Sequence, residues 1–270
     1  MTVESPAVET PVVSSSGLSS SVVWEVAKRS LRNIPRMPST FIPSLVMPAF
    51  LTVAFTGPFG RLADIPGFPA QSIIDWIIPM TTLQGSAIAG VTTGMAIARD
   101  LENGFYDRFL LSPASRVSIL SGPLVASMLR ALFPLILLLV IAFIVGANFF
   151  GGAMGIVVLG IASVGMALAA GAWAIGLALR FKTYQVAPLM QMGMMISIFL
   201  STAQMPLDLL TGWLHQVARF NPVTNVLQLA RQGFLGDVAW ASTWPGLVSL
   251  AGMCGVLLLF AWRGMQKVVP

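Results

Sequence analysis

Five charged side chains lie close together in residues 98–113 of a chain that is only 9% charged. They are three acids and two arginines: Arg99, Asp100, Glu102, Asp107 and Arg108. Such groups form ion pairs and charge-assisted hydrogen bonds, the chemistry by which one protein docks on another. Gly104 and Pro113 interrupt the segment, and long apolar runs flank it. We therefore expect a segment exposed to water that binds a soluble partner; the alternative is an inert loop whose charges only fix topology.

The chain lacks the residues of the common catalytic and nucleotide-binding sites. A P-loop needs Gly-Lys-Ser/Thr, and none of Lys28, Lys182 and Lys267 follows a glycine. One histidine, His215, cannot form a multi-histidine metal site, and no Gly-x-Ser-x-Gly pattern supplies a nucleophile. We therefore expect no catalytic residue, no metal site and no P-loop ATP site here, and we interpret His215 as an interfacial polar residue.

The elements that position the charged segment are apolar, since 56% of the chain is hydrophobic. Uncharged windows cover 37–60, 76–98, 131–179, 183–207 and 238–262. A helix needs about 20 residues to cross the hydrocarbon core. Four windows hold one span each, and the longest holds two, separated at 148–152. The sequence therefore predicts an all-α integral membrane protein with six transmembrane helices, in one domain over 21–262.

The distribution of Lys and Arg predicts the orientation. With both termini cytoplasmic, eleven basic residues lie inside and three lie outside, Arg130 being set aside within a span. This bias matches the positive-inside rule. The formal net charge of +5 is therefore interpreted as topology and contact with lipid headgroups, not as nucleic-acid binding. Residues 1–20 and 263–270 are expected to be cytoplasmic tails, the first disordered.

Residues 21–34 read as an amphipathic helix at the cytoplasmic interface. Trp24 lies at the margin of its apolar face, and Lys28, Arg29 and Arg32 lie on the polar face. A basic polar face is attracted to anionic lipids. The alternative is a soluble helix packed on a partner.

The segment 205–237 is neither a short loop nor a span. Leucines recur at helical spacing up to Val217, Asn221-Pro222 breaks the pattern, and 223–232 offers a second helix. Two short re-entrant helices on the outer side are expected, which the membrane tolerates where protein covers their ends. Asp75 and Arg130 are the charges nearest the spans; we interpret them as anchors at span ends rather than as a proton relay.

These motifs resemble the type-2 ABC transporter permeases, especially the daunorubicin-resistance branch, over most of 21–262. The inner segment matches at Glu102, Gly104, Asp107-Arg108 and Ser112-Pro113. The outer segment matches at Pro206, Trp213, Asn221, Pro222 and Arg231. Two departures are Asn103, where many members carry a basic residue, and Pro79-Met80, where Pro-Gly is common.

The resemblance implies an ATP-driven exporter of a hydrophobic or amphipathic compound, drug or lipid, in a bacterial plasma membrane. Residues 98–113 would be the coupling helix between spans two and three, and the 21–34 helix would brace the same interface. Two separate ATPase subunits would bind ATP and Mg, and a second permease subunit, identical or paralogous, would complete the complex.

Other functions stay open at this point. A polysaccharide or glycolipid exporter of the same superfamily would share both motifs. A non-transporting membrane subunit that binds an ATPase is a further alternative. An intramembrane enzyme is disfavoured by the missing nucleophile, metal ligands and acidic clusters.

Overall fold

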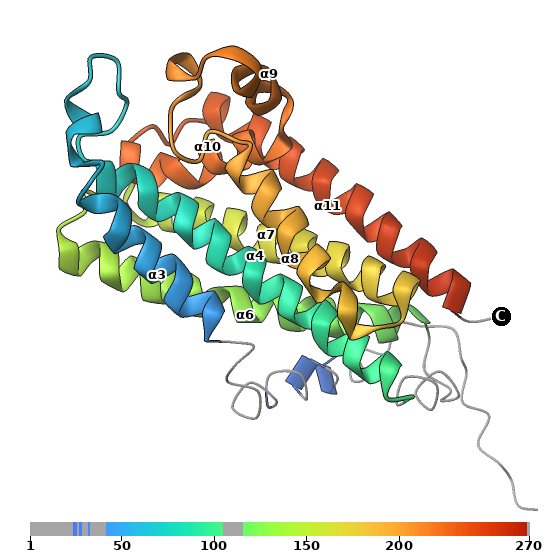
Figure 1. The fold of residues 1–270 in the computed structure, drawn as a ribbon. Helices are drawn as coiled ribbons and strands as arrows, with labels where there is room; N and C mark the ends of the chain where they lie inside the picture. The colour runs from blue at the N-terminus through green and yellow to red at the C-terminus, as the bar shows by residue number, and fades with distance from the viewer. Residues whose placement is uncertain (1–23, 26, 29–31, 33–41, 105–115, 269–270) are drawn as a thin grey trace, which may run out of the picture.

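The computed structural model describes residues 24–25, 27–28, 32, 42–104 and 116–268. Within these ranges the regular structure is entirely helical, so the expected all-α class is confirmed (Figure 1). The helices are α3 (Pro43–Thr56), α4 (Ile73–Glu102), α6 (Arg116–Val145), α7 (Gly152–Phe181), α8 (Ala187–Phe199), α9 (Gly212–Phe220), α10 (Pro222–Leu235) and α11 (Trp240–Val268).

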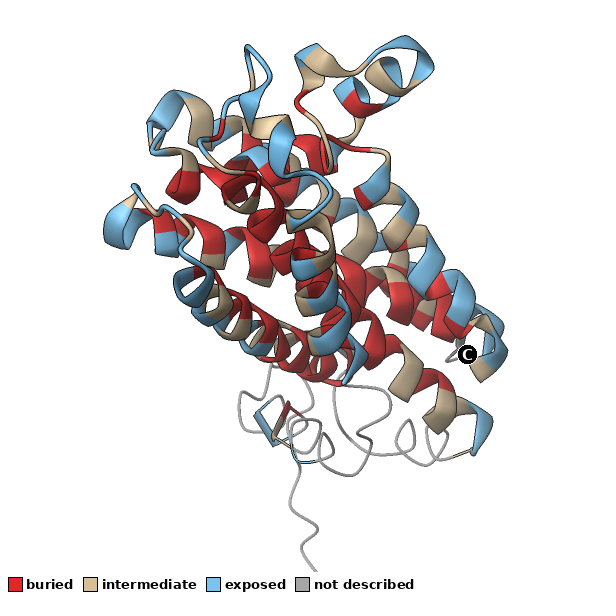
Figure 2. Ribbon diagram, turned by 60° about the vertical axis from the view of Figure 1, so that its left-hand side comes forward, coloured by how far each residue is buried: buried red, intermediate tan, exposed pale blue. Residues whose placement is uncertain are grey.

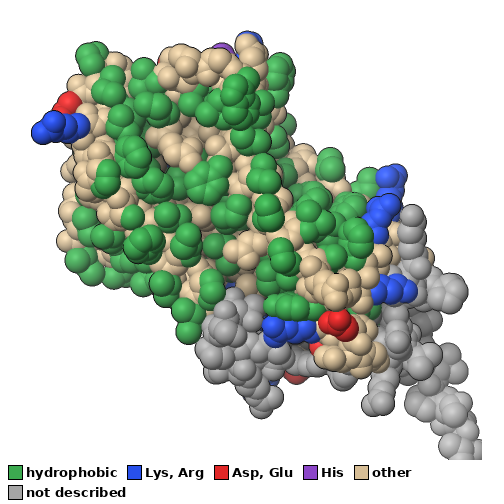
Figure 3. All heavy atoms as spheres, in the orientation of Figure 1, with side chains coloured by type: hydrophobic (Ala, Val, Ile, Leu, Met, Phe, Trp, Pro, Cys, Tyr) green, Lys and Arg blue, Asp and Glu red, His purple; other side chains and the backbone are tan. Residues whose placement is uncertain are grey.

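Three helices of the described part are long and apolar enough to cross a membrane. They contain Val117–Val145, Gly152–Phe181 and Trp240–Gln266. The break expected at 148–152 is confirmed, since α6 ends at Val145 and α7 begins at Gly152. On the face in Figure 3, hydrophobic side chains cover the middle of the molecule, while most of the visible Lys and Arg side chains lie toward one end.

The predicted first and fifth spans are shorter as helices than their uncharged windows. α3 has 14 residues and α8 has 13, which is about 20 Å of helix against a core of about 30 Å. α8 begins only after a 3-10 turn at Tyr184–Val186, and the chain is irregular from Ser201 to Pro206. A lack of charge identified these windows, but it does not report where the helical hydrogen bonds stop. Within the described ranges, these two windows therefore contain less α-helix than a full span needs.

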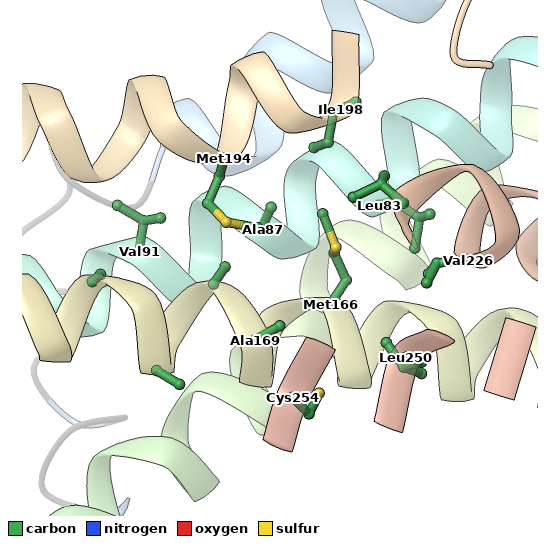
Figure 4. Packing of buried hydrophobic residues seen from close by; sticks show 14 of the residues in the cluster. Leu83, Ala87, Val91, Met166, Ala169, Met194, Ile198, Val226, Leu250 and Cys254 are labelled. Atoms are coloured by element: carbon green, nitrogen blue, oxygen red, sulfur yellow. The ribbon is translucent and has the colours of Figure 1, made fainter. Parts of the chain in front are cut away.

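α4 lies at the centre of the molecule. Almost all of it is buried, from Ile73 to Ala98, and it packs against α3, α6, α7, α8 and α10. Figure 2 shows the buried residues of several helices turned toward one another in the interior. In Figure 4, Leu83, Ala87 and Val91 of α4 approach side chains of α7 and α8, with Val226 of α10 and Leu250 of α11 nearby.

Close packing of α4 on α7 depends on small residues. A Cβ atom at Gly90 would lie 2.3 Å from the carbonyl oxygen of Ala167, and one at Gly94 would lie 2.3 Å from the Cβ of Ala174. The backbones therefore approach as closely as small-xxx-small spacing allows. The second predicted span is thus a packing core and not a lipid-exposed helix.

The outer segment forms two helices, but the first begins later than the leucine spacing predicts. Leu207–Leu209 is a 3-10 turn, and α9 starts at Gly212, whose φ is +67°. Pro206 precedes the turn with extended backbone. The proline and the left-handed glycine separate the early leucines from α9, so they do not share its face. α9, α10 and the segment between α3 and α4 lie at the same end of the molecule (Figure 1).

Candidate functional site

The charged segment begins on the last turn of α4. α4 ends at Glu102, and Asn103 donates its backbone N–H to the carbonyl oxygen of Arg99 at 3.0 Å. Gly104 follows with φ +67°, a conformation that glycine adopts without the steric cost of a Cβ. Gly104 is thus the residue at which the chain turns out of α4 toward the rest of the segment.

The end of α4 holds the link between α7 and α8. Glu102 accepts hydrogen bonds from Thr183 Oγ1 and from the backbone N–H of Tyr184, both at 3.4 Å. Arg99 Nη2 donates to Tyr184 Oη at 3.0 Å, and its guanidinium lies 4.3 Å from the centroid of the Tyr184 ring. Two side chains one turn apart therefore attach α4 to two adjacent residues of this link. We call Arg99, Glu102, Thr183 and Tyr184 the inner clamp.

The other predicted residues of the inner segment are distributed differently. Asp100 is half-buried in the last turn of α4. Asp107, Arg108 and Pro113 lie outside the described residues. The sequence did not single out Thr183 or Tyr184; their one signal was position, as polar residues at the very start of the uncharged window 183–207.

The predicted interface helix is described only in part. Trp24, Lys28 and Arg32 are described as helical, whereas Arg29 lies outside the described residues. Trp24 is 54% exposed, while Ala27 is fully buried. Lys28 Nζ lies 3.8 Å from Glu25 Oε1, an exposed pair one helical turn apart. These positions agree with one buried and one exposed face.

At the outer end, Asn221 connects three helices. It ends α9, and its Oδ1 accepts from the backbone N–H of Val223, which caps α10 in the manner favoured by asparagine, with Pro222 in the first turn. Its Nδ2 donates to the carbonyl oxygen of Ser197 in α8 at 2.6 Å. The predicted break at Asn221-Pro222 is therefore confirmed, and it doubles as an anchor to α8.

Arg231 is a fully buried cation on α10, with 1% of its surface exposed. Its guanidinium lies 3.5 Å from the centroid of the Trp76 ring of α4. Nη2 donates to the carbonyl oxygen of Ala203 at 2.9 Å, and Nη1 to Thr202 Oγ1 at 3.5 Å. None of the acids in the described part forms an ion pair with it. Aromatic and carbonyl contacts replace a carboxylate here.

The other predicted outer residues do not join this cluster. Pro206 is buried at the start of the 3-10 turn, whereas Trp213 is 70% exposed on α9. Exposure of this kind suits an interfacial aromatic residue. We call Trp76, Thr202, Ala203 and Arg231 the outer anchor.

The two charges near span ends have partners within the protein. Asp75 is buried and accepts from the backbone N–H and the Nδ2 of Asn148, at 2.8 and 3.3 Å. Arg130 is 6% exposed, and its Nη1 lies 3.3 and 3.4 Å from the hydroxyls of Thr92 and Thr93 on α4. We expected both side chains to lie at span ends as anchors, but both are buried between helices. Buried polar groups are stable only with hydrogen-bond partners. Each of these bonds therefore also holds α4 to a neighbouring part of the chain.

α4 joins the inner clamp to the outer anchor. Trp76 and Glu102 lie about 39 Å apart along it, at about 1.5 Å per residue, and the helix is continuous between them. In the described ranges, no three His, Cys, Asp or Glu side chains are grouped closely enough to hold a metal ion.

A model of the ABC-2 type transporter family matches residues 21–235. The chain is similar to the daunorubicin resistance ABC transporter permease protein DrrB1 of Streptomyces coeruleorubidus. They are 24% identical over 240 residues, which are 86% of this chain and 81% of that protein.

Two further relatives carry related names. The probable doxorubicin resistance ABC transporter permease protein DrrC of Mycobacterium tuberculosis (strain H37Rv) is 26% identical over 218 residues, 80% of this chain and 78% of the relative. The probable multidrug ABC transporter permease YbhR of Escherichia coli (strain K12) is 27% identical over 189 residues, 66% of this chain. The match spans about half of that longer relative, 49% of its length.

Proposed function

Because this chain belongs to the ABC-2 type transporter family, we propose that it is the membrane subunit of an exporter that moves a hydrophobic or amphipathic compound out of the cell. The relatives named as daunorubicin and doxorubicin resistance permeases favour a drug-like or lipid-like substrate. A separate ATPase supplies the energy, because the chain has no P-loop lysine.

In this proposal the chain crosses the membrane six times with both ends in the cytoplasm. α3, α4, α6, α7, α8 and α11 make the crossings. The residues that adjoin the short helices α3 and α8 complete those two crossings, where protein covers their backbone. A second permease subunit and two ATPase subunits complete the transporter.

The observation that carries the proposal is the connection of both ends through α4. Residues 98–113 would seat on the ATPase, and the inner clamp would pass their movement to the link between α7 and α8. Along α4 the same movement would reach Trp76 and, through Arg231, the outer helix α10. ATP binding would thus bias two arrangements of packed helices, which is how a rigid-body transition is driven.

The test is co-purification of the partner ATPase with the permease and measurement of drug export by the complex. Glu102→Ala and Asp107→Ala should leave membrane insertion intact while weakening ATPase docking or lowering the export per ATP hydrolysed. Asp64→Ala is the matched control, since Asp64 is an exposed acid in the segment between α3 and α4, on the opposite side. Normal docking and export in both inner variants would disprove the coupling role of the segment.

A further inference from the structure

A groove of about 650 Å³ lies between the ends of α7 and α11 that face away from the outer helices. Its lining includes Leu179, Arg180, Lys182, Leu259, Phe260 and Arg263. None of these residues belongs to the inner clamp. Figure 3 shows Lys and Arg side chains gathered at this end of the molecule, close to where the described part of α11 ends.

The groove is basic and has no acid in its lining. Arg180, Lys182 and Arg263 are exposed, and Gln266 is the other polar side chain that lines it. Among the residues described, no carboxylate forms an ion pair with any of the three cations. Glu102 is the acid that contacts the link between α7 and α8, and it is hydrogen-bonded to Thr183 and Tyr184 instead. Within the described ranges, the three positive charges therefore face no acid.

The other half of the groove is apolar and belongs to the two membrane-spanning helices. Leu259 is 48% exposed and Val256 is 69% exposed on the α11 side. At Gly176 an added Cβ would lie 2.3 Å from the Phe260 ring, so this glycine keeps the ring close to α7. Phe260 also stacks on Trp173 at 5.7 Å. The apolar wall is thus held in place by packing.

Two ordinary explanations account for only part of this arrangement. Cations near the end of a helix offset its dipole, which suits Arg180 and Lys182 at the end of α7. Basic residues also accumulate on the cytoplasmic side of membrane proteins. Neither explains why Arg263 of a different helix faces the same groove, or why that groove continues into exposed apolar side chains.

We propose that this groove binds an anionic phospholipid. The phosphate lies among Arg180, Lys182 and Arg263, and an acyl chain runs along Val256, Leu259 and Phe260. Basic pockets between spanning helices on the cytoplasmic side bind such headgroups. A lipid fits better than an acidic protein surface, because half of the wall is apolar and lies on helices that face the bilayer. This inference requires the membrane setting but not the transport activity proposed above.

The test uses the purified full-length protein with dioleoylphosphatidylglycerol or dioleoylphosphatidylcholine, with bound lipid counted by native mass spectrometry. The double variant R180Q/R263Q should bind the anionic lipid more weakly, by about fivefold for each charge removed, with zwitterionic lipid unchanged. R61Q/R219Q removes the same charge from exposed positions at the other end and should bind as the wild type does.

A second pair of variants tests the apolar wall without changing charge. Val256→Trp should fill the groove and reduce binding of the anionic lipid, whereas Val248→Trp, at an exposed position of α11 outside the groove, should not. Soluble glycerol 3-phosphate tests whether the groove binds the headgroup alone. It should compete only weakly with the anionic lipid.

Several outcomes overturn the proposal. They are unchanged lipid binding in monodisperse R180Q/R263Q, equal loss in R61Q/R219Q, and competition by glycerol 3-phosphate as effective as that of the lipid. Loss of ATPase binding with lipid binding intact would assign the cations to a protein partner instead.

Discussion

At the scale of single residues, Arg231 is the buried charge with the most demanding environment. Its guanidinium stacks on Trp76 and donates to the carbonyl oxygen of Ala203. Arg231→Ala removes a desolvated cation–π contact and leaves that carbonyl without its donor, so we expect a loss of about 2–4 kcal/mol in stability. Arg231→Lys should recover only part, because an ammonium lacks the planar stacking surface. Thermal unfolding in detergent measures both.

Arg219→Ala is the control for Arg231, because Arg219 is an exposed arginine on the neighbouring α9. It should unfold within experimental error of the wild type. Equal melting temperatures for Arg219→Ala and Arg231→Ala would show that the outer anchor contributes nothing to stability.

The sequence located Asp75 and Arg130 as charges beside apolar windows but not their partners. Asn148 lies 73 residues from Asp75, and Thr92 lies 38 residues from Arg130. Such pairs form only when the helices pack, so local patterning carries no information on them. An outward-reaching anchor was the simplest prediction for each, and burial between helices replaced it.

At the scale of elements, the contact between α4 and α7 leaves no room at Gly94. An added Cβ would lie 2.3 Å from the Cβ of Ala174 and 2.5 Å from its backbone carbonyl carbon. Backbone atoms in two packed helices cannot shift cheaply, so Gly94→Val should cost about 3 kcal/mol. The yield of monodisperse protein on size-exclusion chromatography, together with the melting temperature, reports the loss.

Gly252→Val on α11 provides the comparison for Gly94→Val. A Cβ at Gly252 would meet no atom within 4 Å, so the same substitution should leave yield and melting temperature close to those of the wild type. If both variants behave alike, valine in a spanning helix is tolerated regardless of packing and the close approach has no energetic role.

Asn221 tests how α8, α9 and α10 are joined. Asn221→Ala removes both the cap of α10 and the hydrogen bond to Ser197, and should lower the stability by about 2 kcal/mol. Asn221→Ser keeps a capping oxygen and loses only the hydrogen bond to Ser197, and should lower the stability by about 1 kcal/mol. The ranking is measured by thermal unfolding. In the co-purified complex, both should impair export more than ATPase binding. Equal loss of both activities would indicate misfolding instead.

Hydropathy predicted some elements well and others poorly. α6, α7 and α11 follow directly from long uncharged windows, because a spanning helix must satisfy its own backbone hydrogen bonds. The window 183–207 has the same composition but contains only 13 residues of α-helix. Thr183 caps a 3-10 turn, and Pro206 ends the irregular stretch after α8. These features are local backbone chemistry that a window average does not resolve.

At the scale of the whole molecule, the inner clamp connects the proposed ATPase-facing segment to the helices beyond it. The ring and the hydroxyl of Tyr184 both contact Arg99, and its backbone N–H donates to Glu102. Tyr184→Leu removes both side-chain contacts while leaving residues 98–113 unchanged. We therefore expect ATPase binding and hydrolysis to persist while the export per ATP hydrolysed falls several-fold. Proteoliposomes containing the co-purified complex measure both rates.

Tyr184→Phe separates the two side-chain contacts. It keeps the ring under the guanidinium and loses only the 3.0 Å hydrogen bond, so export per ATP should fall less than in Tyr184→Leu. That order distinguishes a mechanical link from a general loss of stability, which would reduce ATPase binding as well. An unchanged ratio in Tyr184→Leu would mean that movement reaches α10 without passing through the link between α7 and α8. Of the connections that we propose among the described elements, the path along α4 and through the contact of Arg231 with Trp76 would then remain.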